Sequence, residues 1–335
     1  MRRAAPIPSE LGEAFAVAAA LDAGVSRDRL HASDLARPFR GGRAIRTPQS
    51  VRERVRALAP LLTDDQRYSH LTAAELQGMR LPERPMPQRL HVTYRDANRA
   101  MRRPGVVGHK TTAGVTVTEL PDGVRVSSPV DAWCECATLL TVDELVVMGD
   151  GLVSRRVPAA RPDQLIHAVN MRPGRRGTAR LRQALPLIRA GTDSARETLL
   201  RLAVVRAGFP EPEANAPLVD RHGTVIAHGD LVWPQYRVVL EYEGRQHAED
   251  TDQFAIDIRR LDDIAESDYR VIRVDRQLFA ASADLTRRIA TALRDRGWHP
   301  APAEGSLSGQ FPRGKAPQAT LRRKRGRERE RAARP

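Results

Sequence analysis

The sequence predicts a mixed α/β protein, α+β overall, and three observations support this fold class. Apolar residues alternate as in a strand, most clearly over Tyr236–Glu243. Helical apolar spacing is found in neighbouring segments such as Thr251–Glu266. An apolar content of 41% in 335 residues is enough for ordinary buried cores, and this length suggests two or three domains.

The composition points to a nucleic-acid partner. The formal net charge is +14 and the pI is about 10.9, with arginine supplying nearly all the positive charge. Such a balance favours polyanions, most simply DNA, although a GC-rich genome that enriches arginine and alanine would give a similar composition. The sequence contains neither an 18-residue apolar run nor a signal-like apolar segment, so we expect a cytoplasmic protein without a membrane partner. Cys134 and Cys136 make a poor zinc pattern and are interpreted as reduced packing residues.

Residues 1–48 are predicted to form a DNA-binding helix-turn-helix. Glu10–Ala23 has helical apolar spacing, and Ser26 is a good N-cap for a second helix over Arg27–Leu35. The basic turn Arg37–Arg46 would then be the wing of a winged helix. Short helix pairs also occur in proteins that bind no DNA. The arginines expected to contact DNA are Arg27, Arg40, Arg43 and Arg46.

Residues 49–190 are predicted to form a mixed α/β middle domain that serves as a scaffold or positions DNA. Its histidines are scattered without ligand spacing and are interpreted as ordinary residues: His70, His91, His109 and His167. The predicted helices are Val51–Leu62, Ala73–Met79, Asp131–Leu140, Val142–Leu152 and Pro162–Val169. The predicted strands are Leu90–Tyr94, Val115–Leu120 and Val124–Ser127, the last two joined by a turn at Pro121–Gly123.

Residues 191–299 are predicted to form a further α/β domain, and residues 300–335 a disordered basic tail. The domain begins with a helix capped by Asp193 or Ser194 and ending near Ala207. The remaining predicted elements are a hairpin over Val219–Ala227, strands at Leu231–Trp233, Tyr236–Glu243 and Tyr269–Val274, and helices at Thr251–Glu266 and Ala283–Arg296.

Carboxylates cluster around the strand Tyr236–Glu243. Glu241 and Glu243 are two residues apart, so they share one face of the strand, and Asp230 opens the preceding stretch. Unpaired carboxylates on one sheet face repel each other, whereas a divalent cation would convert that repulsion into coordination. We therefore expect Asp230, Glu241 and Glu243 to bind Mg²⁺ (or Mn²⁺).

Two family resemblances extend this interpretation. Asp230, the run Glu241-Tyr242-Glu243-Gly244 and His247 together resemble the PD-(D/E)xK nuclease superfamily, in particular the very-short-patch-repair endonucleases. Asp257–Arg260 and Tyr269–Arg273 continue the likeness, which covers about residues 190–297. The opening segment loosely resembles the winged-helix domain of abortive-infection-type antitoxins. The first resemblance implies a restriction-endonuclease-like α-β-β-β-α-β core.

The nuclease resemblance also implies roles for individual residues. Asp230 and Glu241 would hold the metal, and His247 would transfer a proton. Glu243 stands where the superfamily has lysine, since Lys110, Lys315 and Lys324 are the only lysines; it would act as a base or belong to a second metal site.

Two further residues have open roles. Arg260 would clamp a phosphate, or would pair with Asp257. Glu197 would either complete a capping box with Ser194 or lie at the metal site, where related nucleases place a glutamate. The function expected is that of a metal-dependent DNA endonuclease. The alternative is a catalytically inactive nuclease fold that acts as a DNA-binding regulator or antitoxin-like protein.

Overall fold

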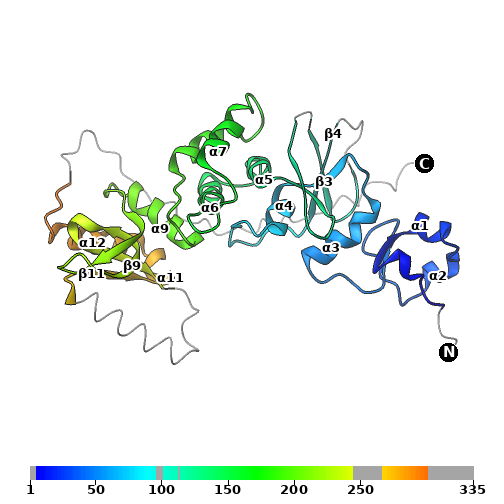
Figure 1. Ribbon diagram of the computed structural model, residues 1–335, viewed down its shortest axis with the longest axis horizontal. Helices are drawn as coiled ribbons and strands as arrows, with labels where there is room; N and C mark the ends of the chain where they lie inside the picture. Colours follow the sequence, from blue (N-terminus) through cyan, green and yellow to red (C-terminus); the bar gives the residue numbers. More distant parts are fainter. Residues whose placement is uncertain (1–4, 96–100, 112–113, 244–265, 301–335) are drawn as a thin grey trace, which may run out of the picture.

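The computed structural model describes residues 5–95, 101–111, 114–243 and 266–300. It is a mixed α/β structure with three separate sheets, in agreement with the predicted fold class. Figure 1 shows an elongated arrangement, with the N-terminal helices at one end and the last sheet at the other. A layer of helices lies between the second and third sheets and links them.

The helices and strands follow one another in mixed order along the chain. The helices are α1 Val17–Asp22, α2 Arg27–His31, α3 Val51–Leu58, α4 His70–Leu76, α5 Pro129–Cys136, α6 Val142–Leu152, α7 Pro162–Asn170, α8 Thr178–Ala184, α9 Ala195–Arg206, α11 Arg276–Ala280 and α12 Ser282–Arg294. The strands are β1 Ala14–Ala16, β2 Gly42–Ala44, β3 Gln66–Tyr68, β4 Leu90–Arg95, β5 Val106–Thr111, β6 Val117–Glu119, β7 Arg125–Ser127, β8 Glu213–Val219, β9 Val225–Trp233, β10 Val238–Tyr242 and β11 Arg270–Val274. The single-turn 3-10 helices are η1 Ser9–Leu11, η2 Ala59–Leu61, η3 Leu185–Leu187 and η4 Pro234–Tyr236.

The N-terminal unit differs from the predicted pair of long helices. The predicted helix Glu10–Ala23 is wrong in its first half, which forms the 3-10 turn η1 and the strand β1. Only the second half, α1, is α-helical. The reason is long-range pairing, because β1 runs antiparallel to β2 and aligns Phe15 with Arg43. The second helix, α2, begins as predicted, and the Ser26 hydroxyl accepts the Arg29 N–H. The segment expected to be a wing thus closes a small sheet around α1 and α2.

The middle sheet has the strand order β5-β4-β3-β7-β6. The predicted turn at Pro121–Gly123 is confirmed, since it joins the antiparallel strands β6 and β7. The sequence did not predict β3 or β5, and β5 runs parallel to β4 with Thr93 opposite His109. Helices α3 and α4 pack on this sheet through a core that includes Val55, Leu58 and Tyr68.

The third sheet has the order β11-β10-β9-β8, with β10 and β11 parallel and the other pairs antiparallel. One face packs against α9 and α12 through a core that includes Leu200, Leu240 and Ile289. The predicted strand at Tyr269–Val274 and the closing helix are confirmed as β11 and α12. The predicted helix Thr251–Glu266 lies almost wholly outside the described residues.

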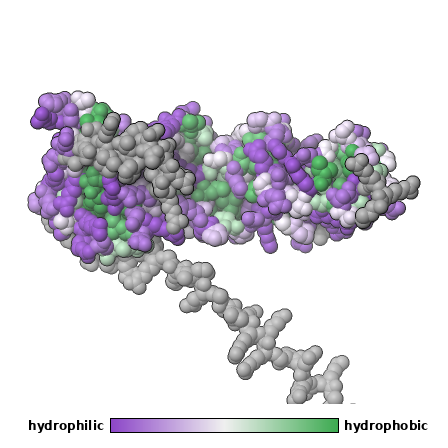
Figure 2. Space-filling model, turned by 90° about the horizontal axis from the view of Figure 1, so that it is seen from below, coloured by the Kyte–Doolittle hydropathy of each residue, from purple (hydrophilic) through white to green (hydrophobic). Residues whose placement is uncertain are grey.

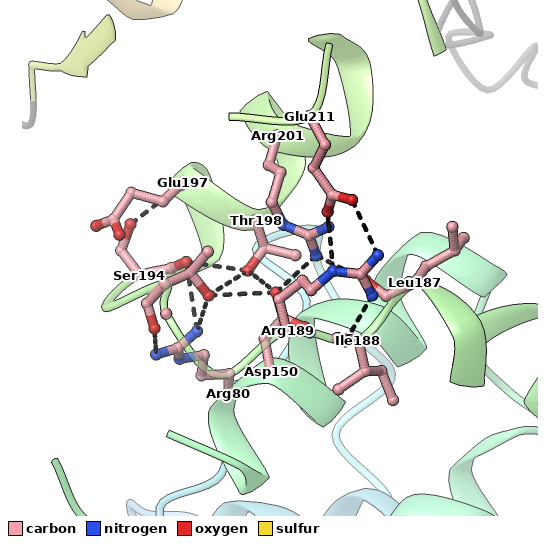
Figure 3. A network of polar contacts seen from close by, with 12 residues as sticks. Arg80, Asp150, Leu187, Ile188, Arg189, Ser194, Glu197, Thr198, Arg201 and Glu211 are labelled. Carbon is pink, nitrogen blue, oxygen red and sulfur yellow. Dashed lines mark hydrogen bonds and ion pairs between the residues drawn. The ribbon is translucent and has the colours of Figure 1, made fainter. Parts of the chain in front are cut away.

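Helix α9 joins the helical layer to the third sheet. Leu200 and Val204 belong to the core of the sheet, whereas Leu202 belongs to the core built by α5, α6, α7 and α8. Arg201, on the same helix, forms an ion pair of 3.0 Å with Asp150 of α6, inside the polar network shown in Figure 3. Asp150 also accepts the Arg189 N–H at 2.7 Å and the Thr198 hydroxyl at 2.9 Å. These contacts fix the N-terminal turn of α9.

The surface is largely polar. In the view of Figure 2, hydrophilic residues cover most of the described surface, and hydrophobic residues form separate patches. Within the described part of the chain, each helix is too short or too polar to cross a membrane.

Candidate active site on the C-terminal sheet

A row of polar residues crosses the third sheet from edge to edge. Glu241 of β10 is the register partner of Arg273 on β11. Asp230 lies one step beyond the Leu231–Leu240 pair, and its Oδ2 accepts the Tyr242 N–H at 2.8 Å. Strand alternation therefore directs the Asp230 and Glu241 side chains to the same face. The predicted proximity of these two acids is consistent with the strand pairing.

Asn215 extends this row to β8. It lies between the pairs Ala214–Leu231 and Ala216–Gly229, level with Asp230, and has a left-handed backbone with a φ of 51°. Its amide Nδ2 donates to the Gly191 carbonyl at 2.8 Å and to Glu197 Oε2 at 3.0 Å. Asn215 thus ties the start of the sheet to the start of α9, where Glu197 lies.

Glu197 has a structural partner and also faces the acid row. The Ser194 hydroxyl accepts the Glu197 N–H, as in a capping box, but the Glu197 carboxylate accepts the N–H of Asp193 at 2.7 Å. The side chain is 7% exposed, so this carboxylate is held almost entirely out of water. Both roles left open by the sequence are therefore compatible with its position.

A cavity of about 530 Å³ joins these residues. Glu197, Asn215 and Asp230 line it together with His228 and Asp193. Arg155 and Arg156, from the loop after α6, also line the cavity and both pair with Asp193 Oδ2, at 3.4 Å and 2.6 Å. The site thus combines carboxylates, an imidazole and two guanidinium groups.

The electrostatics of the cavity favour a bound cation. Burial raises the pKa of Glu197, and the nearby Asp230 carboxylate raises this pKa further. Asp193 Oδ1 is a buried carboxylate oxygen with no hydrogen-bond partner. Carboxylate and amide oxygens are the ligands that Mg²⁺ prefers, and Mg²⁺ keeps several waters, so one or two of these carboxylates would be enough to hold it. The oxygen atoms present are of the type that Mg²⁺ or Mn²⁺ prefers, but among the described residues the acids of this cavity form no group of three ligands within 4.8 Å of one another.

The three acids expected to bind metal do not form a tight cluster. Among the described residues, His70, His91 and His109 are the one group of three or more candidate ligands whose atoms lie within 4.8 Å of one another. Glu243 forms an ion pair of 3.4 Å with Arg273, and both side chains are about half exposed. Arg273 therefore offsets the negative charge of Glu243. Glu197 lines the cavity together with Asp230, whereas Glu243 is not among the lining residues.

The other predicted site residues have varied positions. His247 and Arg260 lie outside the described residues. Arg27 and Arg40 are exposed, and Arg46 is exposed and pairs with Glu13 at 2.9 Å. Arg43 is buried and donates to the carbonyls of Leu30 and Gly42, so its guanidinium holds the N-terminal unit together.

Sequence reasoning missed Asn215, His228 and Asp193 as site residues. His228 is two residues before Asp230 on the same strand, so strand alternation alone places both side chains on one face. Asn215 gave no such signal, because its role depends on the left-handed backbone that interrupts β8.

Comparison with known proteins leaves the family open. No family model matches the chain. Two uncharacterized proteins of Mycobacterium tuberculosis, one from each of two strains, are each 35% identical to the chain over 80 residues. The matched segment is 24% of this chain and 29% of each relative. The chain thus spans less than a third of these relatives, whose names describe no activity.

Proposed function

We propose that the protein is a metal-dependent DNA endonuclease whose active site is the cavity between α9 and β9. The observation that supports this most directly is the meeting of two carboxylates from different elements. Glu197 of α9 and Asp230 of β9 line one cavity, and the charge of Asp230 raises the pKa of Glu197. Arg155 and Arg156 border the same cavity and would bind the phosphate of the scissile strand.

The chemistry of this residue set suits phosphodiester hydrolysis. When bound, Mg²⁺ or Mn²⁺ would lower the pKa of water and neutralise charge on the phosphate. Glu197 and Asp230 would hold the ion, and Glu241 follows Asp230 on the same face of the sheet. His228 is an imidazole at the cavity wall and is the candidate for proton transfer.

The order of elements supports assignment of residues 191–299 to a nuclease core of the PD-(D/E)xK kind. A helix, three antiparallel strands and a final strand parallel to the third occur in the expected order as α9, β8, β9, β10 and β11. In this proposal Glu197 and Asp230 form the metal-binding pair. Glu243 forms an ion pair with Arg273 of β11 and does not replace the lysine of the superfamily.

Cleavage of supercoiled, nicked and mismatched DNA by the purified protein tests this function. We expect cleavage with Mg²⁺ or Mn²⁺, none in EDTA, and a loss of at least about two orders of magnitude for Asp230→Asn. Asp220→Asn is the matched control, because Asp220 caps the β8–β9 turn through the N–H groups of His222 and Thr224. Full cleavage in excess EDTA would refute the proposal.

The second candidate is an inactive nuclease fold that regulates through DNA binding. The Glu243–Arg273 ion pair favours it. Glu243 stands where the superfamily has lysine, and here it makes a structural contact with Arg273. DNA binding without metal-dependent cleavage on any of the three substrates would select this candidate.

A further inference from the structure

Three histidines that are distant in sequence meet on the middle sheet. His70 begins α4, His91 lies on β4 and His109 on β5. Thr93 is the register partner of His109 and lies two residues after His91, so the His91 and His109 side chains share one face of the sheet. His91 Nδ1 and His109 Nε2 are 2.8 Å apart. The ring centroids of His70 and His109 are 3.7 Å apart.

The protein maintains this arrangement against backbone strain. His70 has a φ of 50°, a left-handed conformation that is rare for residues other than glycine. Glu135 of α5 accepts the His70 N–H at 3.2 Å, and Ser69 Oγ lies 2.9 Å from His70 Nδ1. Strained residues held by their surroundings concentrate at functional sites, where the strain fixes a side chain that the function needs.

Burial favours the neutral form of the three imidazoles. Burial lowers the pKa of His91 and of His109 to about 4, and the positive charge of His109 would lower the pKa of His91 further. Burial also lowers the pKa of His70 well below its usual range.

We propose that His70, His91 and His109 form a site for a divalent transition metal, with Zn²⁺ as the first candidate. In a tetrahedral zinc site with Zn–N bonds of 2.0–2.1 Å, ligand nitrogens are about 3.3 Å apart. The present separations, from 2.8 Å to at most 4.8 Å, bracket this value. The rings of His70 and His109 are stacked with an interplanar angle of 19°, so metal binding requires these side chains to turn until their ring nitrogens face one ion. Imidazole nitrogen suits zinc, whereas the oxygen ligands around Asp230 suit magnesium.

The surroundings resemble those of metal-bound histidines. The Ser69 hydroxyl lies 2.9 Å from His70 Nδ1, within hydrogen-bond distance, and Glu135 Oε2 lies farther away at 3.9 Å. A hydrogen bond to the second ring nitrogen is what orients a ligand imidazole. A cavity of about 610 Å³ opens beside the rings and is bordered by Lys110, Arg172, Arg175 and Arg176. Three protein ligands leave a fourth position open, and this basic border suits a phosphate group there.

Titration of the metal-stripped full-length protein with Co²⁺ tests the site without reference to nuclease activity. We expect about one equivalent of Co²⁺ with the visible bands of a four-coordinate ion, displacement by Zn²⁺, and a spectral change on addition of inorganic phosphate. His91→Asn and His109→Asn should weaken Co²⁺ binding by at least about tenfold. His167→Asn is the matched control, since His167 is exposed on α7. Asp230→Asn should also leave the bands intact.

Thermal melting of each variant separates lost ligands from lost folding. Should the histidine variants fail to fold, X-ray absorption of the zinc-loaded wild-type protein decides the question, because the outer ring atoms of imidazole ligands give multiple-scattering features that carboxylate and water ligands lack. Three imidazole ligands support the proposal. An all-oxygen shell, binding unchanged in folded His91→Asn and His109→Asn, or no Co²⁺ bands at all would overturn it. If inorganic phosphate leaves the Co²⁺ bands unchanged, the fourth ligand is water and the proposed binding of phosphate at this position is wrong.

Discussion

The Asp150 carboxylate of α6 and the Arg201 guanidinium of α9 form an ion pair whose two side chains are 0% and 2% exposed. Burial raises the pKa of Asp150, and Arg201 together with the Arg189 N–H and the Thr198 hydroxyl opposes this shift. The pair stands between the helical layer and the candidate active site, so its integrity affects both.

Arg201→Met should lower the free energy of unfolding by about 3–5 kcal/mol, because it leaves a buried carboxylate without its counter-charge. Asp143 and Arg206 offer a matched control, since they pair between the same two helices but are 28% and 41% exposed. Asp143→Asn should cost about 1 kcal/mol or less. Urea unfolding of both variants measures the difference, and equal losses would contradict this account of α9.

Glu197→Gln should stabilise the metal-free protein more at neutral pH than it does near pH 4.5, which is the ordinary pKa of a glutamate. The pKa of Glu197 is raised in the folded state, so folding favours the protonated form, and stability is lost as pH rises through the folded pKa. Glutamine cannot ionise and escapes this loss. Thermal melts in EDTA across this pH range provide the measurement. A difference independent of pH would mean that burial and the Asp230 charge do not raise the pKa of Glu197 in the folded protein.

Glu241→Gln and Glu243→Gln should have different effects on DNA cleavage, although the two glutamates are only two residues apart. Glu241 shares a sheet face with Asp230, so its loss should reduce cleavage by about two orders of magnitude. Glu243 forms a half-exposed ion pair with Arg273, which is worth about 1 kcal/mol or less, so cleavage should stay within about fivefold. Single-turnover rates measure both. A larger loss of cleavage for Glu243→Gln would mean that Glu243 takes the catalytic role of the absent lysine.

Truncation after Gly309 should weaken DNA binding without changing where the DNA is cut. The removed segment contains ten basic and two acidic residues, a net charge of +8. If about half of these charges contact phosphates, the slope of log K against log salt should fall by about 3–4. Phosphate contacts position a protein and do not specify sequence, so the cleavage pattern should persist. An unchanged slope with an altered pattern would reverse this assignment.

Local signals in the sequence predicted the elements that local interactions stabilise. Helix α6 has the predicted bounds, because Thr141 and Glu144 form a capping box and apolar spacing marks its buried face. The strand β10 followed from alternation, whereas the association of Asp230 with Glu241 followed from the nuclease resemblance. Elements that depend on distant partners were missed, as β1 and β5 show: β1 needs β2, and β5 needs β4.

The same limit applies to the candidate sites. His70, His91 and His109 gave no ligand spacing because their proximity depends on the parallel pairing of β4 with the unpredicted β5. The Arg273 partner of Glu243 was hidden because it lies on a strand that is parallel to β10 and remote in sequence. Repulsion among Asp230, Glu241 and Glu243 was therefore overestimated.

Because α9 contributes Leu202 to one core and Leu200 and Val204 to another, the helical layer and the third sheet share a structural element. Neither can lose α9 without exposing apolar side chains of its own, so the two should melt in a single cooperative transition. A fragment that begins at residue 191 would leave Arg201 without Asp150 and Leu202 without its neighbours. Pulse proteolysis of the intact chain should accordingly release no protected C-terminal fragment, and calorimetry should give one peak for both regions.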